Sequence, residues 1–150
     1  MLRIFITIII YALGFVGLAQ ESQKKDKNTG ETLTHQVDVV INNINSDKGA
    51  VYFALYNSEL NFNERKQFMI SKSEIIAGVA KVSFIGLEPN TYAITCFHDA
   101  NSNGKMDFEV NGRPTEDYGI TNNIISYGPP RFGDAKFDLK DKDLTFEIEF

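Results

Sequence analysis

The chain has 150 residues, with 15 Lys and Arg against 20 Asp and Glu, so its formal net charge at pH 7 is −5. An acidic chain lacks the basic face that nucleic-acid phosphates require, and we expect no nucleic-acid partner. A single cysteine, Cys96, excludes an intramolecular disulfide. The length suits one domain whose core is large enough to fold without such a crosslink.

The first 19 residues have the order of a secretory signal peptide. Arg3 supplies one positive charge, residues 4–18 are uncharged and mainly apolar, and the small residues Gly17 and Ala19 precede a predicted cut. The alternative is an uncleaved membrane anchor, but a spanning helix needs about 20 apolar residues. We therefore predict export to the periplasm, cell envelope or medium, with no transmembrane span after cleavage. The mature chain then has 14 basic and 20 acidic residues, a net charge of −6.

Residues 20–34 hold few side chains that a core could bury. Low hydrophobicity and dense charge do not repay the entropy lost on ordering, so this segment is predicted to be a disordered tether. The remaining residues, 35–150, are predicted to form one domain.

Apolar and polar residues alternate with a period of two through most of that domain, which is typical of half-buried strands. Strands are expected at 37–41, 51–56, 66–71, 79–84, 92–98, 135–139 and 144–150, with one short helix within 58–66. The spacing favours an antiparallel β-sandwich of seven or eight strands, with an up-and-down barrel as the alternative. Ten phenylalanines remain after cleavage, and we expect them to form the core.

One segment has the composition of a calcium loop. The run Asp99 to Gly104 fits the first half of the pattern D-x-[DN]-x-[DN]-G, in which alternate side chains present oxygen ligands. The predicted ligands are the side chains of four residues and the carbonyl of a fifth: Asp99, Asn101, Asn103, Asp107 and Lys105. Calcium is the only cofactor that we expect.

After Gly104 the sequence no longer matches the pattern of a helix–loop–helix calcium site. Position 12 of such a loop is a bidentate glutamate, whereas this chain has Val110 there, and the preceding segment is a predicted strand. Glu109, Glu116 or Asp117 are candidates to complete the shell. With two carboxylates in the loop, we expect weak binding, on the order of 10⁻⁴–10⁻³ M. The alternative is a metal-free loop in which Asp and Asn bond their own backbone.

Cys96 and His98 lie two residues apart on a predicted strand and therefore share a face. A Cys–His nucleophile pair is one interpretation. The same face carries Tyr92 and Ile94, which indicates core, and a free cysteine is commonly a buried small apolar residue. We expect His98 to be a hydrogen-bonded anchor for the loop that follows it.

Several runs resemble a known family: Phe97 to Asp107 (FHDANSNGKMD), Gly112 to Gly119 (GRPTEDYG), Pro130 to Phe137 (PRFGDAKF) and Val51 to Asn57 (VYFALYN). They are similar to the exported bacterial proteins classed as domain of unknown function 2141. The resemblance implies a periplasmic or secreted β-sandwich, in outline like prealbumin-like or Ig-like domains, and implies no activity. Gly119-Ile120-Thr121 departs from the Gly-Phe-Ser common in that family.

These observations favour a non-enzymatic module, expected to be a monomer, whose long loops between Asp99 and Arg131 bind an envelope protein, a glycan or a small ligand. Motifs for the common hydrolases and nucleotide-binding enzymes are missing from the sequence. The alternative, by fold-level analogy, is an extracytoplasmic hydrolase. It would use a loop-end pocket in which His98 and Cys96 meet Arg113 or Arg131.

Overall fold

A computed structural model describes residues 33–125 and 128–150. The predicted signal peptide, residues 1–19, and the predicted tether as far as residue 32 lie outside the described residues. The described strands are β1 (His35–Ile41), β2 (Ala50–Tyr56), β3 (Met69–Ser73), β4 (Ala80–Leu87), β5 (Asn90–Asp99), β6 (Tyr118–Ile120), β7 (Lys136–Leu139) and β8 (Leu144–Glu147). Two short helices, α1 (Glu59–Asn63) and α2 (Phe132–Ala135), and the 3₁₀ turn η1 (Thr121–Asn123) complete them.

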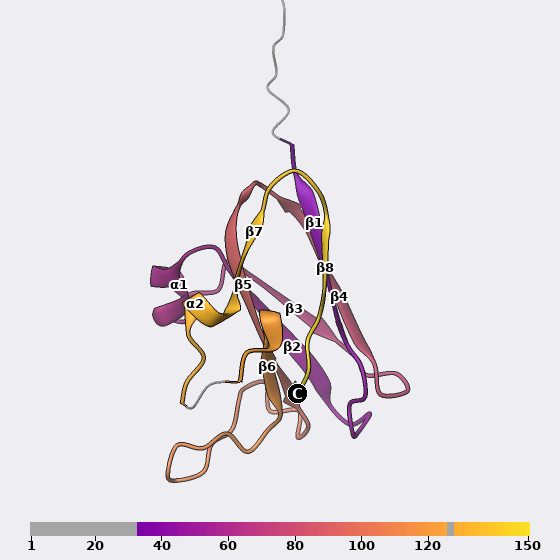
Figure 1. Cartoon of the computed structure of the whole chain (residues 1–150). Coiled ribbons are helices and arrows are strands. Elements are labelled where there is room, and N and C mark those ends of the chain that lie inside the picture. The colour runs from indigo at the N-terminus through magenta and orange to yellow at the C-terminus, as the bar shows by residue number, and fades with distance from the viewer. Residues whose placement is uncertain (1–32, 126–127) are drawn as a thin grey trace, which may run out of the picture. The chain divides into compact units, whose positions relative to one another are not determined.

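The strands form two sheets (Figure 1). In the first, β1 lies between β4, to which it is antiparallel, and β8, to which it is parallel. The second has the order β3-β2-β5-β6, and β7 pairs with the first half of β5. Two separate sheets confirm the predicted all-β sandwich and exclude the single closed sheet that was its alternative.

The core lies between the two sheets and follows the predicted alternation. Fully buried side chains come from both sheets: Val37, Val39 and Ile41 of β1, Phe84 and Leu87 of β4, and Val51, Phe53, Leu55 and Ile94 of β2 and β5. The face of β5 that carries Tyr92, Ile94, Cys96 and His98 is buried along its length, as the pattern predicted. Burial of one such phenylalanine contributes about 1.5–3 kcal/mol.

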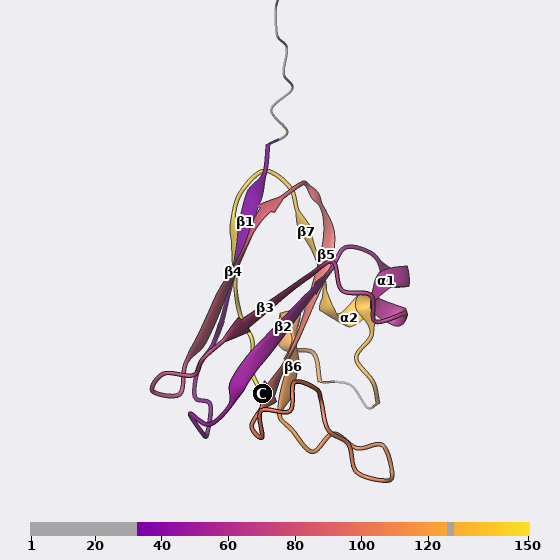
Figure 2. The same cartoon turned by 180° about the vertical axis from the view of Figure 1, so that it is seen from behind.

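A second, smaller apolar cluster covers part of the outer face of the five-stranded sheet. It joins strand residues to the two helices and consists of Tyr56, Phe62, Ala93, Ile120, Phe132 and Ala135. Helix α1 is short but capped, because the Ser58 hydroxyl accepts a hydrogen bond from Asn61 N at 3.2 Å. Figure 2 shows both helices beside β5, away from β1 and β4.

One predicted strand is displaced along the chain, and one strand was not predicted. The strand expected at 66–71 is β3, Met69–Ser73, because Arg65 adopts a left-handed conformation (φ 56°) and Lys66 N bonds back to Asn61 O. The chain is therefore still leaving the helix where extended structure was expected. Strand β6 was not predicted, since it has three residues inside what reads as one long loop.

The segment between β5 and β6 projects from the end of the sandwich at which β5 finishes, and the chain ends at the same end (Figure 1). The β1–β2 connection also lies at this end (Figure 2). We call this region the loop end. Among the described residues, no helix has the length and apolar character needed to cross a membrane.

Candidate functional site

The candidate calcium loop starts from a rigid point of the sandwich. Asp99 is the last residue of β5 and is buried. Next to it, His98 Nε2 lies 2.7 Å from the carbonyl oxygen of Lys48, in the β1–β2 connection. His98 is therefore hydrogen-bonded, as expected, but the partner of its side chain lies in the β1–β2 connection and not in the loop that follows His98. Gly49 approaches the Asp99 carbonyl so closely that a Cβ there would lie 2.8 Å from its carbon atom and overlap its oxygen.

The Asp99 carboxylate turns the chain back on itself. Its two oxygens accept hydrogen bonds from Asn103 N at 3.0 Å and from Gly104 N at 2.9 Å. Ser102 and Gly104 have positive φ angles of 61° and 78°, so the loop curls tightly around the carboxylate. A glycine suits the second of these positions, because only glycine adopts positive φ without steric cost.

The side chains of Asn101, Asn103 and Asp107 meet inside this curl. Both asparagine Nδ2 atoms donate to the same oxygen, Asp107 Oδ2, at 2.6 Å. The asparagine Oδ1 atoms accept from Asn103 N and Lys105 N, each at 3.0 Å. The structure thus brings the predicted side chains at 101, 103 and 107 together, with Asp99 bonded to the backbone between them.

Glu116 closes the loop from outside the predicted ligand set. Its Oε1 accepts from Ala100 N and its Oε2 from Asp107 N, both at 3.2 Å. It reaches them because Phe108 and Pro114 pair across a short hairpin. From the sequence, Glu116 was only one of three candidates to complete the site. Residue spacing alone does not show which of the three carboxylates the hairpin brings close to the loop.

The side-chain and carbonyl oxygens of this loop are of the kind that a hard cation takes as ligands. Among the described residues no three His, Cys, Asp or Glu side chains form a group able to hold a metal by themselves. A metal at this loop would therefore need amide and carbonyl oxygens beside the carboxylates of Asp99 and Asp107. Calcium accepts such mixed oxygen shells of six to eight ligands, whereas softer metals favour histidine and cysteine.

Cys96 and His98 have separate partners. The Cys96 thiol donates to Gly119 O at 3.5 Å and is buried, and this burial raises the pKa of the thiol above its ordinary value of 9.0. His98 is held by the Lys48 carbonyl, and Arg131 pairs with Asp134 at 3.0 Å. The described residues therefore give no positive support to the hydrolase alternative.

We expect Cys96 of the folded protein to resist thiol-modifying reagents, because the thiolate is the reactive form and burial disfavours it. Timed labelling with a chromogenic disulfide should be at least about 100-fold slower in buffer than in 8 M urea, since reaction requires opening of the fold. Labelling of the folded protein at the rate of a free thiol would contradict this.

The same shift gives a pH dependence with a defined sign. Above pH 9.0 the unfolded thiol loses its proton while the folded thiol keeps it. The contribution of this group to stability is therefore complete below pH 9 and falls as the pH rises further.

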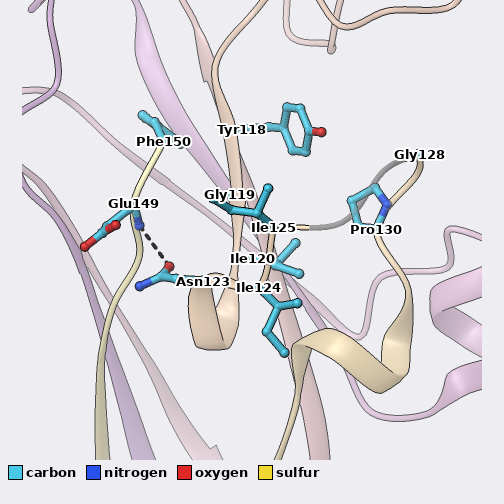
Figure 3. Close-up of a pocket in the computed structure, with 10 residues that line it drawn as sticks. All are labelled: Tyr118, Gly119, Ile120, Asn123, Ile124, Ile125, Gly128, Pro130, Glu149 and Phe150. Carbon is cyan, nitrogen blue, oxygen red and sulfur yellow. Dashed lines mark hydrogen bonds between the residues drawn. The ribbon is translucent and has the colours of Figure 1, made fainter.

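Two hollows lie at the loop end beside the segment Ile148–Phe150. The first, of about 190 Å³, has a mainly apolar lining that includes Tyr118, Ile120, Ile124, Pro130 and Phe150 (Figure 3). The second, of about 270 Å³, is lined by polar residues that include Asn42, Asn45, Asp117, Glu147 and Glu149. Neither is lined by Cys96, His98, Arg113 or Arg131. The sequence indicated only long loops here, because these residues are distant along the chain.

Asn123 fixes the wall between the hollows. Its Oδ1 accepts from Glu149 N at 3.0 Å (Figure 3). Its Nδ2 donates to Glu147 O at 3.0 Å. Asn122 Nδ2 donates to the backbone carbonyl oxygens of Asp134 and Lys136, each at 3.0 Å. The two asparagines therefore tie η1 to both C-terminal strands.

Residues 39–147 match the model of a protein family described as an uncharacterised protein conserved in bacteria (DUF2141). The chain belongs to this family. The match confirms the resemblance found in the loop runs, and it covers both sheets and the candidate calcium loop of this DUF2141 domain. Neither the curated proteins nor the solved structures gave a match. The family description names no activity, so the function has to be argued from the site.

Proposed function

We propose that this DUF2141 protein is an exported, non-enzymatic binding module whose loop end is ordered by calcium. The observation that carries the proposal is the convergence of Asn101, Asn103 and Asp107 within a loop curled around the Asp99 carboxylate. Export is supported by the signal-peptide order of residues 1–19. Mass spectrometry of the protein recovered outside the cytoplasm should give a chain that starts at Gln20, and an intact Met1 in that fraction would exclude cleavage.

Electrostatics favours a cation in this loop. Asp99, Asp107 and Glu116 are linked through the same short stretch of backbone, and each brings a negative charge. Without a cation these carboxylates repel one another, with an energy that depends on their separation and on how far each is exposed to solvent. A divalent ion would offset that repulsion. The oxygens of Asn101 and Asn103, which accept backbone N–H groups in this structure, and the Lys105 carbonyl would add neutral ligands.

Calcium should raise the melting temperature of residues 20–150. At tenfold excess over a dissociation constant of about 10⁻⁴–10⁻³ M, binding to the folded state alone stabilises by roughly 1.4 kcal/mol. For a domain of this size the melting temperature should rise by roughly 3–6 °C. Differential scanning calorimetry in chelator and then in 10 mM calcium measures the shift. Magnesium should have less effect, because it demands octahedral geometry and gives up water reluctantly.

Asp107→Asn is the test variant, because it removes one charge and keeps an oxygen for the asparagine amides. It should abolish the calcium-dependent rise while changing the melting temperature in chelator by less than about 2 °C, the range of a surface substitution. Asp141→Asn, in the exposed β7–β8 turn, is the matched control and should keep the full rise. Equal rises in both variants would exclude Asp107 as a ligand.

A further inference from the structure

The two hollows at the loop end differ in chemistry and share one wall. Glu149 and Phe150 line both of them. On one side lies the apolar hollow, with Phe150 and Glu149 at one edge and Pro130 at the other (Figure 3). On the other side lies the polar hollow, whose lining carries three carboxylates: Asp117, Glu147 and Glu149.

These three carboxylates have no cationic partner among residues 33–125 and 128–150. The ion pairs in that part of the chain involve Asp143, Glu64 and Asp134 instead. Nor do the three form a group able to hold a metal ion. Carboxylates are acceptors for ammonium and guanidinium groups, which carry several N–H donors, so this lining suits an organic cation.

The apolar hollow is the size of a side chain. Its volume of about 190 Å³ is below the roughly 300–1,000 Å³ of pockets that bury a drug-sized ligand. Its rim exposes large apolar groups, because Tyr118 and Phe150 are each 39% exposed and Ile124 is 48% exposed. Exposed apolar residues that gather around a recess mark interaction sites more often than isolated ones do.

We propose that the loop end binds a peptide segment of a partner protein in which a large apolar residue is followed by lysine or arginine. The apolar side chain fills the first hollow. The long cationic side chain crosses the exposed Phe150 ring with its apolar stem and places its charge among Asp117, Glu147 and Glu149. Charge complementarity selects this occupant, since an acidic peptide would face the same three carboxylates. The inference rests on the proposed binding role and adds the chemistry of the partner.

The test uses two synthetic peptides, acetyl-Gly-Ser-Phe-Lys-Gly-Ser-amide and the same peptide with glutamate in place of lysine. Each is titrated into ¹⁵N-labelled protein in chelator, so that calcium plays no part in the result. The Phe-Lys peptide should cause saturable amide shifts at Gly119, Ile120 and Glu149, with a dissociation constant at least about tenfold lower than that of Phe-Glu. Raising the NaCl concentration to 0.5 M should weaken Phe-Lys binding, because salt screens exposed charges.

Variants locate the site on each side of the wall. Glu149→Gln should weaken Phe-Lys binding at least about fivefold, while its backbone bond to Asn123 is kept. Ile124→Asp should weaken both peptides, and Glu88→Gln, in the β4–β5 turn, should change neither. Absence of saturable shifts, equal affinity for the two peptides, or shifts confined to another face would overturn the inference. The calcium proposal is tested separately, by calcium-dependent melting. A negative result with the peptides therefore does not bear on calcium binding.

Discussion

Replacing Gly49 with alanine should destabilise the domain by about 2–5 kcal/mol. Gly49 has a φ of +75°, which costs a residue with a Cβ about 1–2 kcal/mol. The new Cβ would also overlap the carbonyl oxygen of Asp99, and a packed contact that has to be pushed apart costs typically 1–3 kcal/mol more. Urea unfolding followed by circular dichroism measures the loss, which is a large fraction of the 5–15 kcal/mol typical of a domain.

Gly86→Ala is the matched control for this prediction. Gly86 has nearly the same φ, +73°, but no atom lies within 4 Å of a Cβ built there. The Gly86→Ala variant should lose only the stability that the positive φ angle costs a residue with a Cβ, about 1–2 kcal/mol. If the two variants lose the same stability, the β1–β2 connection does not press on Asp99 as described. A larger loss in Gly49→Ala shows that the connection fixes the start of the candidate calcium loop.

Thr121→Val should destabilise by about 2–6 kcal/mol, although valine has almost the same shape. Strand β5 pairs with β7 up to Ala93 and with β6 from Thr95, so Ile94 has no strand partner on that side. The Thr121 hydroxyl fills the gap, accepting from Ile94 N at 2.9 Å and donating to Ile94 O at 3.2 Å. Thr121 is fully buried, and each backbone group left without a partner costs about 1–3 kcal/mol.

Thr121→Ser separates the hydroxyl from the methyl group. Serine keeps both hydrogen bonds and removes one buried methyl, so the expected loss is only about 1 kcal/mol. The measurement is again urea unfolding, with both variants compared to the unchanged protein. A serine variant as unstable as the valine variant would show that packing, and not the hydroxyl, holds this junction together.

The sandwich was predictable because apolar and polar residues alternate with a period of two along strands that have one buried face. In β1, Val37, Val39 and Ile41 face the core while Asp38 does not, and that alternation is visible in the sequence. The positive-φ turn at Gly49 was visible as a loop signal. Its contact with Asp99 was not, because that contact joins residues 50 positions apart.

The candidate site was predictable only where it is local. The curl from Asp99 to Asp107 follows a short pattern whose side chains bond within the same nine residues. Glu116 enters through a hairpin, and the hollows need η1, the C-terminal segment and the β1–β2 connection together. Strand β6 was missed for a related reason: its three residues are extended because β5 pairs with them, and three residues carry no readable period.

The most direct test of the account is a calcium titration of ¹⁵N-labelled residues 20–150, followed by amide shifts at each position. The account predicts saturable shifts confined to Asp99–Asp107 and Glu116, with a dissociation constant on the order of 10⁻⁴–10⁻³ M. Asp107→Asn should lose these shifts and Asp141→Asn should keep them. An unchanged spectrum up to 20 mM calcium, or identical shifts with magnesium, would contradict the central claim and leave the loop as a hydrogen-bonded turn without a metal.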